Sequence, residues 1–257
     1  MPRKKIKFSF KPFFIIAGIV LAVFLLLSAL ADSARDSDYF QIKEVIASSE
    51  EGKDFSYLKG ENIFSLDLNK ESRYILEHYP AYRSIRLVRI LPDRLYIQFI
   101  KRYPAAVVRL YRNFYVDRYG VLFYPPEEGI DTNLPVITGI ETKIFGPKPG
   151  KKYDTRELKL ALEIINFCRF NRVIRRFRIK RIDARDLKDI SLFLSPAVEN
   201  TGGNLAEGSL IQVKFNQSEL KERIGTLASI LANSQKELPQ IKYIDLRYKD
   251  PVIKMRE

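Results

Sequence analysis

Apolar residues gather first in one long run near the N-terminus. No charged residue occurs from Phe13 to Ala31, and these roughly 19 residues would span about 29 Å as a helix, close to the hydrocarbon thickness of a bilayer. A core helix of a soluble domain would carry a polar stripe, which this run lacks. The pattern predicts a transmembrane helix at residues 13–31, preceded by a basic tail at residues 1–12.

The run also has one feature of a cleaved signal peptide, because Ala29-Leu30-Ala31 fits the small-x-small pattern of a cleavage site. It is longer than the roughly 7–15 apolar residues of a signal peptide, which favours an uncleaved anchor. The basic residues before the run favour a cytoplasmic N-terminus. Both interpretations place the rest of the chain outside the cytoplasm.

Beyond a polar linker at residues 32–39, short alternating segments replace the long run. The first group predicts a strand from Phe40, a helix at about residues 70–79, and strands at residues 82–90 and 94–101. Asn69 is expected to cap this helix and Pro80 to end it. The order of these elements predicts a small α+β module at residues 40–104.

From residue 105 onward, the pattern consists of short strands, turns and two helices. Capping signals at Asp154–Glu157 and at Asn216–Glu219 precede the two helices. The elements expected near the C-terminus are helices ending at about residues 170 and 232, a final strand at 241–248 and an extended piece after Pro251. The predicted fold class is therefore α+β, with a single N-terminal transmembrane helix, a small module and a β-rich module at residues 105–257.

Composition leaves few residues for catalysis. Lys and Arg number 44 against 31 Asp and Glu, a net charge of +13, and the chain has one Cys and one His. A single Cys excludes a disulfide framework, and a single His removes most zinc sites and Ser-His-Asp triads. Cys168 falls on an apolar helical stripe, and Glu127 and Glu128 lie in a Pro/Gly loop typical of solvated carboxylates. We predict no catalytic residue, no metal site and no cofactor.

A basic run at residues 172–181 is the strongest charge signal after the N-terminal tail. The expected extracytoplasmic location excludes nucleic acid as its partner, and no small-molecule substrate is indicated. An anionic surface is a candidate partner, through Arg175, Arg176, Arg178 and Lys180. The alternative interpretation is a solvated strand edge that resists aggregation.

Seven short phrases occur in order along nearly the whole chain. They are residues 40–45 (FQIKEV), 60–67 (GENIFSLD), 89–95 (RILPDRL), 101–105 (KRYPA), 116–123 (VDRYGVLF), 134–139 (LPVITG) and 244–248 (IDLRY). Each phrase is weak by itself, but their combination resembles the FtsQ/DivIB family of bacterial cell-division proteins.

The resemblance implies a POTRA-like domain at residues 40–104 and the family's β domain at residues 105–257. It also implies a non-enzymatic scaffold, held in the lipid of the cytoplasmic membrane by residues 13–31 and found at the division septum. Its expected partners are divisome proteins resembling FtsB and FtsL, together with septal wall synthases. Alternatives from other classes are an envelope enzyme, a wall-polymer-binding protein and a POTRA-bearing secretion component.

The C-terminal segment is the expected partner site. The resemblance implies that Arg247 and Tyr248 begin an FtsB-facing surface and that residues 251–256 supply a sheet edge. Such an edge offers unpaired amides and carbonyls to an incoming strand. Val252 and Lys254 are expected in this edge, where proline at either position would remove a donor. The alternative is that Arg247 and Tyr248 only pin the final strand to the preceding helix.

Overall fold

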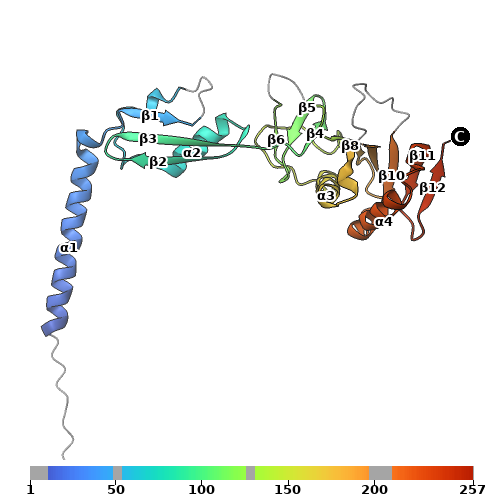
Figure 1. Ribbon diagram of the computed structural model, residues 1–257. Helices are drawn as coiled ribbons and strands as arrows, with labels where there is room; N and C mark the ends of the chain where they lie inside the picture. Colours follow the sequence, from blue (N-terminus) through green and yellow to red (C-terminus); the bar gives the residue numbers. More distant parts are fainter. Residues whose placement is uncertain (1–10, 49–53, 126–130, 197–209, 257) are drawn as a thin grey trace, which may run out of the picture. The chain divides into compact units, whose positions relative to one another are not determined.

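The computed structural model in Figure 1 describes residues 11–48, 54–125, 131–196 and 210–256. The predicted apolar run forms part of α1 (Lys11–Asp36), whose segment Ile16–Asp36 is long and apolar enough to cross a membrane. The linker expected at residues 32–39 is mostly helical, since α1 continues to Asp36 and a 3-10 turn, η1 (Asp38–Phe40), follows. An ion pair between Arg35 and Asp32, one turn apart at 3.4 Å, supports this extra helical turn.

The chain folds into two compact units. The first runs through His78 and includes Tyr82–Ile100, and the second comprises Tyr79–Ala81 and the chain from Lys101 onward. Helices and sheets occur together in the described residues, which confirms the α+β fold class. The domain bounds at residues 104 and 105 and the POTRA-like assignment stay predictions.

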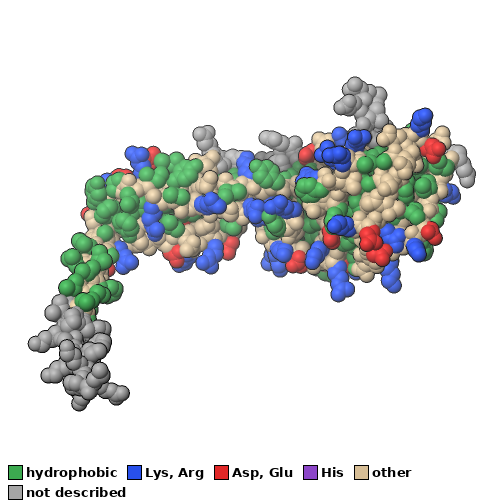
Figure 2. Space-filling model, turned by 60° about the horizontal axis from the view of Figure 1, so that its bottom comes forward, with side chains coloured by type: hydrophobic (Ala, Val, Ile, Leu, Met, Phe, Trp, Pro, Cys, Tyr) green, Lys and Arg blue, Asp and Glu red, His purple; other side chains and the backbone are tan. Residues whose placement is uncertain are grey.

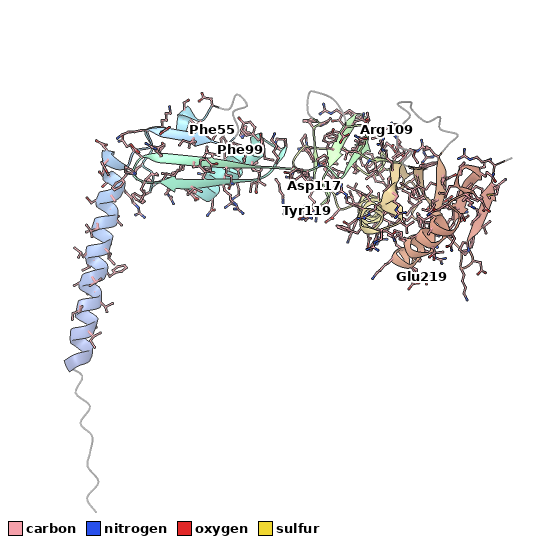
Figure 3. The ribbon with its side chains drawn as sticks, viewed as in Figure 1. Phe55, Phe99, Arg109, Asp117, Tyr119 and Glu219 are labelled. Atoms are coloured by element: carbon pink, nitrogen blue, oxygen red, sulfur yellow. The ribbon has the colours of Figure 1, made fainter. Side chains whose placement is uncertain are left out.

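Beyond α1, the part of the first unit that the structure describes is a three-stranded sheet with one α-helix. Its elements are β1 (Glu44–Ala47), the 3-10 turn η2 (Ser56–Leu58), α2 (Leu68–His78), β2 (Tyr82–Ile90) and β3 (Arg94–Lys101). The strand order is β1-β3-β2, with β1 parallel to β3, and α2 contacts β2. The rings of Phe55 and Phe99, labelled in Figure 3, meet in its core with centroids 5.9 Å apart. The bounds of β2 and β3 agree with the prediction.

The cap of α2 differs from the prediction. Oδ1 of Asp67 accepts hydrogen bonds from the backbone amides of Asn69 and Lys70, at 2.9 and 3.1 Å, and these bonds lower the pKa of Asp67. The helix begins at Leu68, so Asn69 lies within the first turn and its own amide needs an acceptor. The last residue, His78, precedes Pro80 by two positions, as expected from the clash of proline with a helical turn.

In its described residues, the second unit is a nine-stranded sheet with two α-helices. Its strands are β4 (Ala106–Arg109), β5 (Asn113–Val116), β6 (Leu122–Phe123), β7 (Val136–Thr138), β8 (Phe177–Asp183), β9 (Ile190–Pro196), β10 (Ile211–Phe215), β11 (Ile241–Asp245) and β12 (Val252–Met255). Its helices are α3 (Arg156–Phe170), α4 (Leu220–Asn233) and the 3-10 turns η3 (Ile174–Arg176) and η5 (Leu238–Gln240). The strand order is β12-β11-β10-β9-β8-β7-β4-β5-β6.

One face of this sheet packs against α3 and α4. A single cluster of buried residues joins the helices to the strands, including Leu158, Ile164, Leu227, Leu231, Val108, Leu192, Val213 and Ile244. Val107, Tyr115 and Phe123 form a separate buried cluster. Val107 alternates with Ala106 and Val108 of the main core, so the small cluster lies on the other face.

Both helices of the second unit begin later than their predicted capping signals indicate, α3 by one residue and α4 by three. Thr155, not Asp154, caps α3 by accepting a hydrogen bond from the Leu158 amide. Glu219 precedes α4 with a left-handed φ of 55° and makes no side-chain cap. The side chain of Asn216 serves the C-terminal turn described below instead.

A buried ion pair closes the turn between β5 and β6. Arg102 and Asp117 approach to 2.5 Å, with side chains only 8% and 4% exposed. The other carboxylate oxygen of Asp117 accepts hydrogen bonds from the backbone amides of Tyr119 and Val121. Asp117 and Tyr119 are labelled in Figure 3. Gly120 completes the turn at φ 83°, where a Cβ would meet the Tyr153 carbonyl oxygen at 2.7 Å.

Candidate functional site

The open edge of the second sheet is β12. Among the described residues it pairs only with β11, antiparallel, and all four of its side chains are exposed. The backbone amide of Arg256 donates to the Gln240 carbonyl next to β11. Because successive amides of a strand point in opposite directions, those of Lys254 and Val252 also point to β11. The amides of Ile253 and Met255 therefore point to the open edge, and this register differs from the expectation that positions 252 and 254 would supply its donors.

The two faces of β12 differ in chemistry. Ile253 and Met255 lie opposite Ile244 and Ile241, which are buried under the helical layer, yet they remain 42% and 38% exposed. Val252 and Lys254 lie opposite Asp245 and Tyr243 on the other face. The helical layer thus ends before the edge strand, and two apolar side chains are left uncovered on its side of the sheet.

The turn from β11 to β12 is held by bonds to distant residues. β11 ends at Asp245, three residues earlier than predicted, and the Leu246 amide donates to the Lys214 carbonyl. Asn216 Nδ2 donates to the Arg247 carbonyl at 2.8 Å, and the Arg223 guanidinium of α4 donates to the Tyr248 carbonyl. The backbone that leads into β12 is therefore pinned before any partner binds.

The guanidinium of Arg247 is held by two carboxylates of its own unit. Its Nη2 donates to Asp245 Oδ2 at 2.6 Å and its Nε to Asp245 Oδ1 at 3.0 Å, while Nη1 lies 3.2 Å from Asp189 Oδ2. The hydrogen bonds from Arg247 lower the pKa of Asp245, and Asp245 in turn raises the pKa of Arg247. Arg247 thus orients the turn, whereas the ring of Tyr248 is 62% exposed beside it.

This pair makes stability depend on acidity. A carboxylate whose folded pKa is lowered stabilises the fold above its ordinary value of 3.8, and the contribution is lost as pH falls through the lowered pKa. Between about pH 5 and about pH 2, the unfolding free energy of Asp245→Asn should therefore fall less steeply than that of the wild type, as measured by urea unfolding. Asp154→Asn, which removes an exposed partner of Lys152, should keep the wild-type slope. Equal slopes for wild type and Asp245→Asn would contradict the assignment.

Of the predicted partner residues, the structure brings all four to one place. Arg247 and Tyr248 lie in the turn, and Val252 and Lys254 follow in β12. The sequence pattern predicted neither the outward amides of Ile253 and Met255 nor the residues that support the turn: Asp189, Asn216 and Arg223. The Asn-Gln-Ser-Glu phrase looked like a helix cap, and no local signal indicates that Asn216 reaches a carbonyl 31 positions away.

The four residues predicted to contact an anionic surface lie elsewhere in the second unit. Arg175 and Arg176 are exposed in η3, and Arg178 and Lys180 lie in β8. β8 pairs with β9 along most of its length but with β7 only at residues 181–183, so among the described residues the part that carries Arg178 and Lys180 is paired on one side only. The interpretation of this run as a strand edge therefore stays open. Cross-strand pairing between distant segments decides which strands are interior, and no local pattern shows it. Anion binding by these residues stays a prediction.

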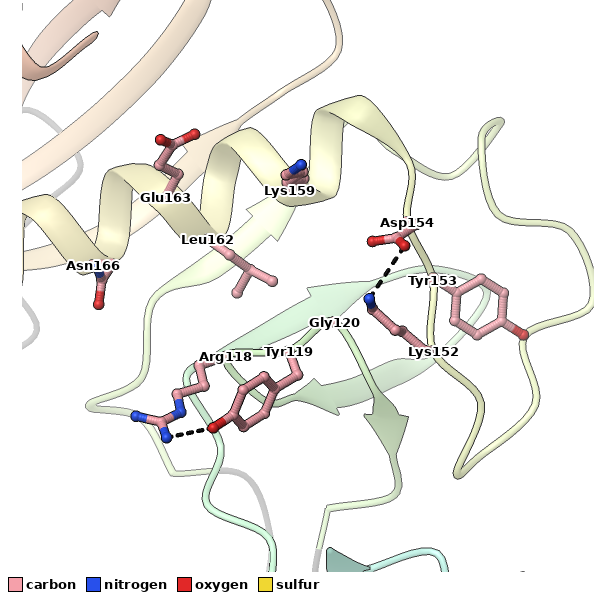
Figure 4. Close-up of a pocket in the computed structure, with 10 residues that line it drawn as sticks. All are labelled: Arg118, Tyr119, Gly120, Lys152, Tyr153, Asp154, Lys159, Leu162, Glu163 and Asn166. Atoms are coloured by element: carbon pink, nitrogen blue, oxygen red, sulfur yellow. Dashed lines mark hydrogen bonds and ion pairs between the residues drawn. The ribbon is translucent and has the colours of Figure 1, made fainter. Parts of the chain in front are cut away.

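A shallow pocket of about 550 Å³ lies in the second unit, where the exposed side of α3 faces the segments around residues 120 and 153 (Figure 4). In it, Lys152 pairs with Asp154 at 3.2 Å, and the Arg118 guanidinium donates to the Tyr119 hydroxyl. This lining pairs no nucleophile with a base, so it shows no catalytic constellation among the residues described there.

The other candidate reactive groups, Cys168 and His78, contact residues that give them a structural role. Cys168 is buried in α3, and burial raises the pKa of its thiol to about 12. His78 Nδ1 lies 2.8 Å from the Tyr74 carbonyl oxygen one turn earlier. Within the described ranges, no group of three His, Cys, Asp or Glu could hold a metal ion. Glu127 and Glu128 lie outside the described residues.

Comparisons with known proteins agree on one family. The family description "Cell division protein FtsQ/DivIB, C-terminal" matches residues 106–247. The cell division protein FtsQ of Geotalea daltonii is 26% identical over 195 residues, which cover 76% of this chain and 66% of that protein. FtsQ of Syntrophotalea carbinolica is 26% identical over 81% of this chain and 71% of its own, and FtsQ of Anaeromyxobacter sp. is 24% identical over 93% and 81%.

The matched region contains the strands β4 to β11 and both α-helices of the second unit, and it ends at Arg247 within the phrase at residues 244–248. It exceeds half of the 257 residues. With its apolar N-terminal helix and its α+β fold, this chain belongs to the FtsQ/DivIB family of cell-division proteins.

Proposed function

We propose that this protein is a non-enzymatic scaffold of the division machinery, which binds other divisome subunits through the edge strand β12. Its proposed partners resemble FtsB and FtsL, and their assembly is coupled to the septal wall synthases. The basic tail before α1 supports a cytoplasmic N-terminus, with both folded units outside the cytoplasmic membrane at the septum.

The observation that carries the proposal is a strand edge that no other described residue pairs with, on a prearranged support. Asn216, Arg223 and Asp245 hold the preceding turn, so little conformational entropy is lost when a partner strand pairs with β12. Binding by strand addition draws affinity from the backbone and specificity from alternate side chains. It needs no catalytic group.

The edge also limits the chemistry of the partner strand. Its carbonyls must meet the outward amides of Ile253 and Met255. Apolar side chains are needed on the helical side, where these two residues are uncovered, and a carboxylate on the other side would pair with Lys254. We expect a partner segment that alternates apolar and acidic positions.

The exposed ring of Tyr248 offers a direct test. Tyr248→Ala should weaken binding of an FtsB-like subunit by about 1–3 kcal/mol, roughly 5-fold to 150-fold, because buried aromatic rings dominate interface energies. The measurement is titration calorimetry with the extracytoplasmic fragment, paired with a thermal melt. Tyr111→Ala, which truncates a ring 71% exposed in the same unit, is the matched control and should bind as wild type.

The opposite pattern would argue for a purely structural role. If Tyr248→Ala lowers the melting temperature and the folded fraction binds normally, the ring only supports the turn. If Tyr248→Ala and Tyr111→Ala both leave binding unchanged, and no divisome subunit copurifies with the wild-type chain, the proposed edge is not the partner site.

A further inference from the structure

Three segments of the first unit meet at the end where α1 arrives. Asn62 Nδ2 donates to the carbonyl of Ala34 at 3.0 Å and to that of Ser37 at 3.3 Å, so its loop is tied to the last turn of α1. The Oδ1 atom of the same side chain accepts the amide of Phe64 at 2.9 Å. The Lys43 amide donates to the Asp93 carbonyl at 2.8 Å, which brings the turn between β2 and β3 to the same end.

These bonds place the loops at a definite level relative to the apolar run. The run ends at Ala31, and Ala34 follows three residues later, which is about 4.5 Å along a helix. The headgroup layer on each side of a bilayer is roughly 5–8 Å thick. A loop bonded to the Ala34 carbonyl therefore lies at headgroup depth once α1 crosses the membrane.

Apolar side chains are exposed at this end of the unit. Tyr39, Phe64 and Leu91 are 64%, 37% and 57% exposed. A surface that faced only water would favour polar residues at these positions. Phe40 bridges the first two, with ring centroids 5.1 Å from Tyr39 and 5.0 Å from Phe64. Figure 2 shows hydrophobic side chains gathered at the end of the first unit that α1 joins.

We propose that Tyr39, Phe64 and Leu91 form an interfacial cluster that enters the headgroup layer of the membrane and fixes the first unit on the bilayer surface. Aromatic side chains prefer this layer because the ring is apolar and its edge or hydroxyl is accommodated by water and headgroups. Asn62 is the positioning residue, since it connects α1 to Phe64. The inference rests on α1 crossing the membrane, as in the proposed function.

The absence of tryptophan from the chain allows a clean measurement. Phe64→Trp and Tyr39→Trp each introduce a single fluorophore into the full-length protein, reconstituted in phosphatidylcholine vesicles. Phe24→Trp places the fluorophore within α1, and Phe145→Trp places it at a side chain 82% exposed in the second unit. Quenching is compared between lipids brominated near the headgroup and lipids brominated deep in the acyl chain, with circular dichroism to verify folding.

The expected result is three different depths. Phe24→Trp should be quenched most by deep bromine, Phe64→Trp and Tyr39→Trp most by shallow bromine with blue-shifted emission, and Phe145→Trp by neither. If Phe24→Trp is quenched while Phe64→Trp and Tyr39→Trp behave as Phe145→Trp, the interfacial cluster is overturned and the membrane anchor stands. If Phe24→Trp is itself unquenched, α1 does not cross the bilayer, and the proposed membrane topology fails together with the cluster.

Discussion

Ile253→Pro should abolish most partner binding with almost no change in the stability of the protein. The Ile253 amide points to the open edge, so proline removes a donor that an incoming strand needs and leaves a partner carbonyl unsatisfied. We expect a loss of about 2 kcal/mol, roughly 30-fold in affinity. The measurement is the affinity for an FtsB-like subunit beside the thermal melt of the same sample.

Two further variants separate the backbone from the side chain. Ile253→Ala keeps the amide and should lose less affinity than Ile253→Pro. Lys254→Pro removes an amide that points to β11, so it should lower the melting temperature as well as binding. If Lys254→Pro leaves stability intact and eliminates binding while Ile253→Pro binds as wild type, the register of the edge is the reverse of the one described.

Arg102→Ala should destabilise the second unit by about 3–5 kcal/mol, because it leaves the buried carboxylate of Asp117 without its cation. Asp117 is 3% exposed, so bulk solvent compensates its charge only weakly. Its two backbone hydrogen bonds to Tyr119 and Val121 would then hold an uncompensated charge in the turn between β5 and β6. Urea unfolding of residues 37–257 measures the change.

The matched control is Arg185→Ala. Arg185 lies 3.9 Å from Asp183 with its side chain 81% exposed, and its removal should cost less than about 0.5 kcal/mol. Adding Asp117→Asn to Arg102→Ala should recover part of the lost stability, since the second change removes the stranded charge. A double variant that is as unstable as the sum of both single variants would contradict a direct ion pair.

Local patterns predicted the bounds of β2 and β3 in the first unit, whereas β1 begins at Glu44, four residues after the predicted start at Phe40. Leu95, Ile97 and Phe99 alternate with polar residues, and β3 has the expected bounds because one buried face suffices to produce that alternation. Strand β11 shows where the rule fails. A register shift between Ile241 and Tyr243 adds one residue, so Ile241 and Ile244 are both buried although they are three positions apart.

By itself, the sequence determined the apolar helix, the α+β class, the shortage of reactive groups and a family resemblance that the comparisons confirm. These properties depend on composition, on short periodic patterns and on phrases of a few residues. Only the tertiary structure decided that β8 lies between β7 and β9, that Arg102 neutralises Asp117, and that Arg247 is held by Asp245 and Asp189. Strand pairing joins residues that are far apart in the chain, and so do the ion pairs from Arg102 to Asp117 and from Arg247 to Asp189. Even the short-range bond between Arg247 and Asp245 depends on how the turn closes. Their geometry is set by strand order and packing, which no local pattern encodes.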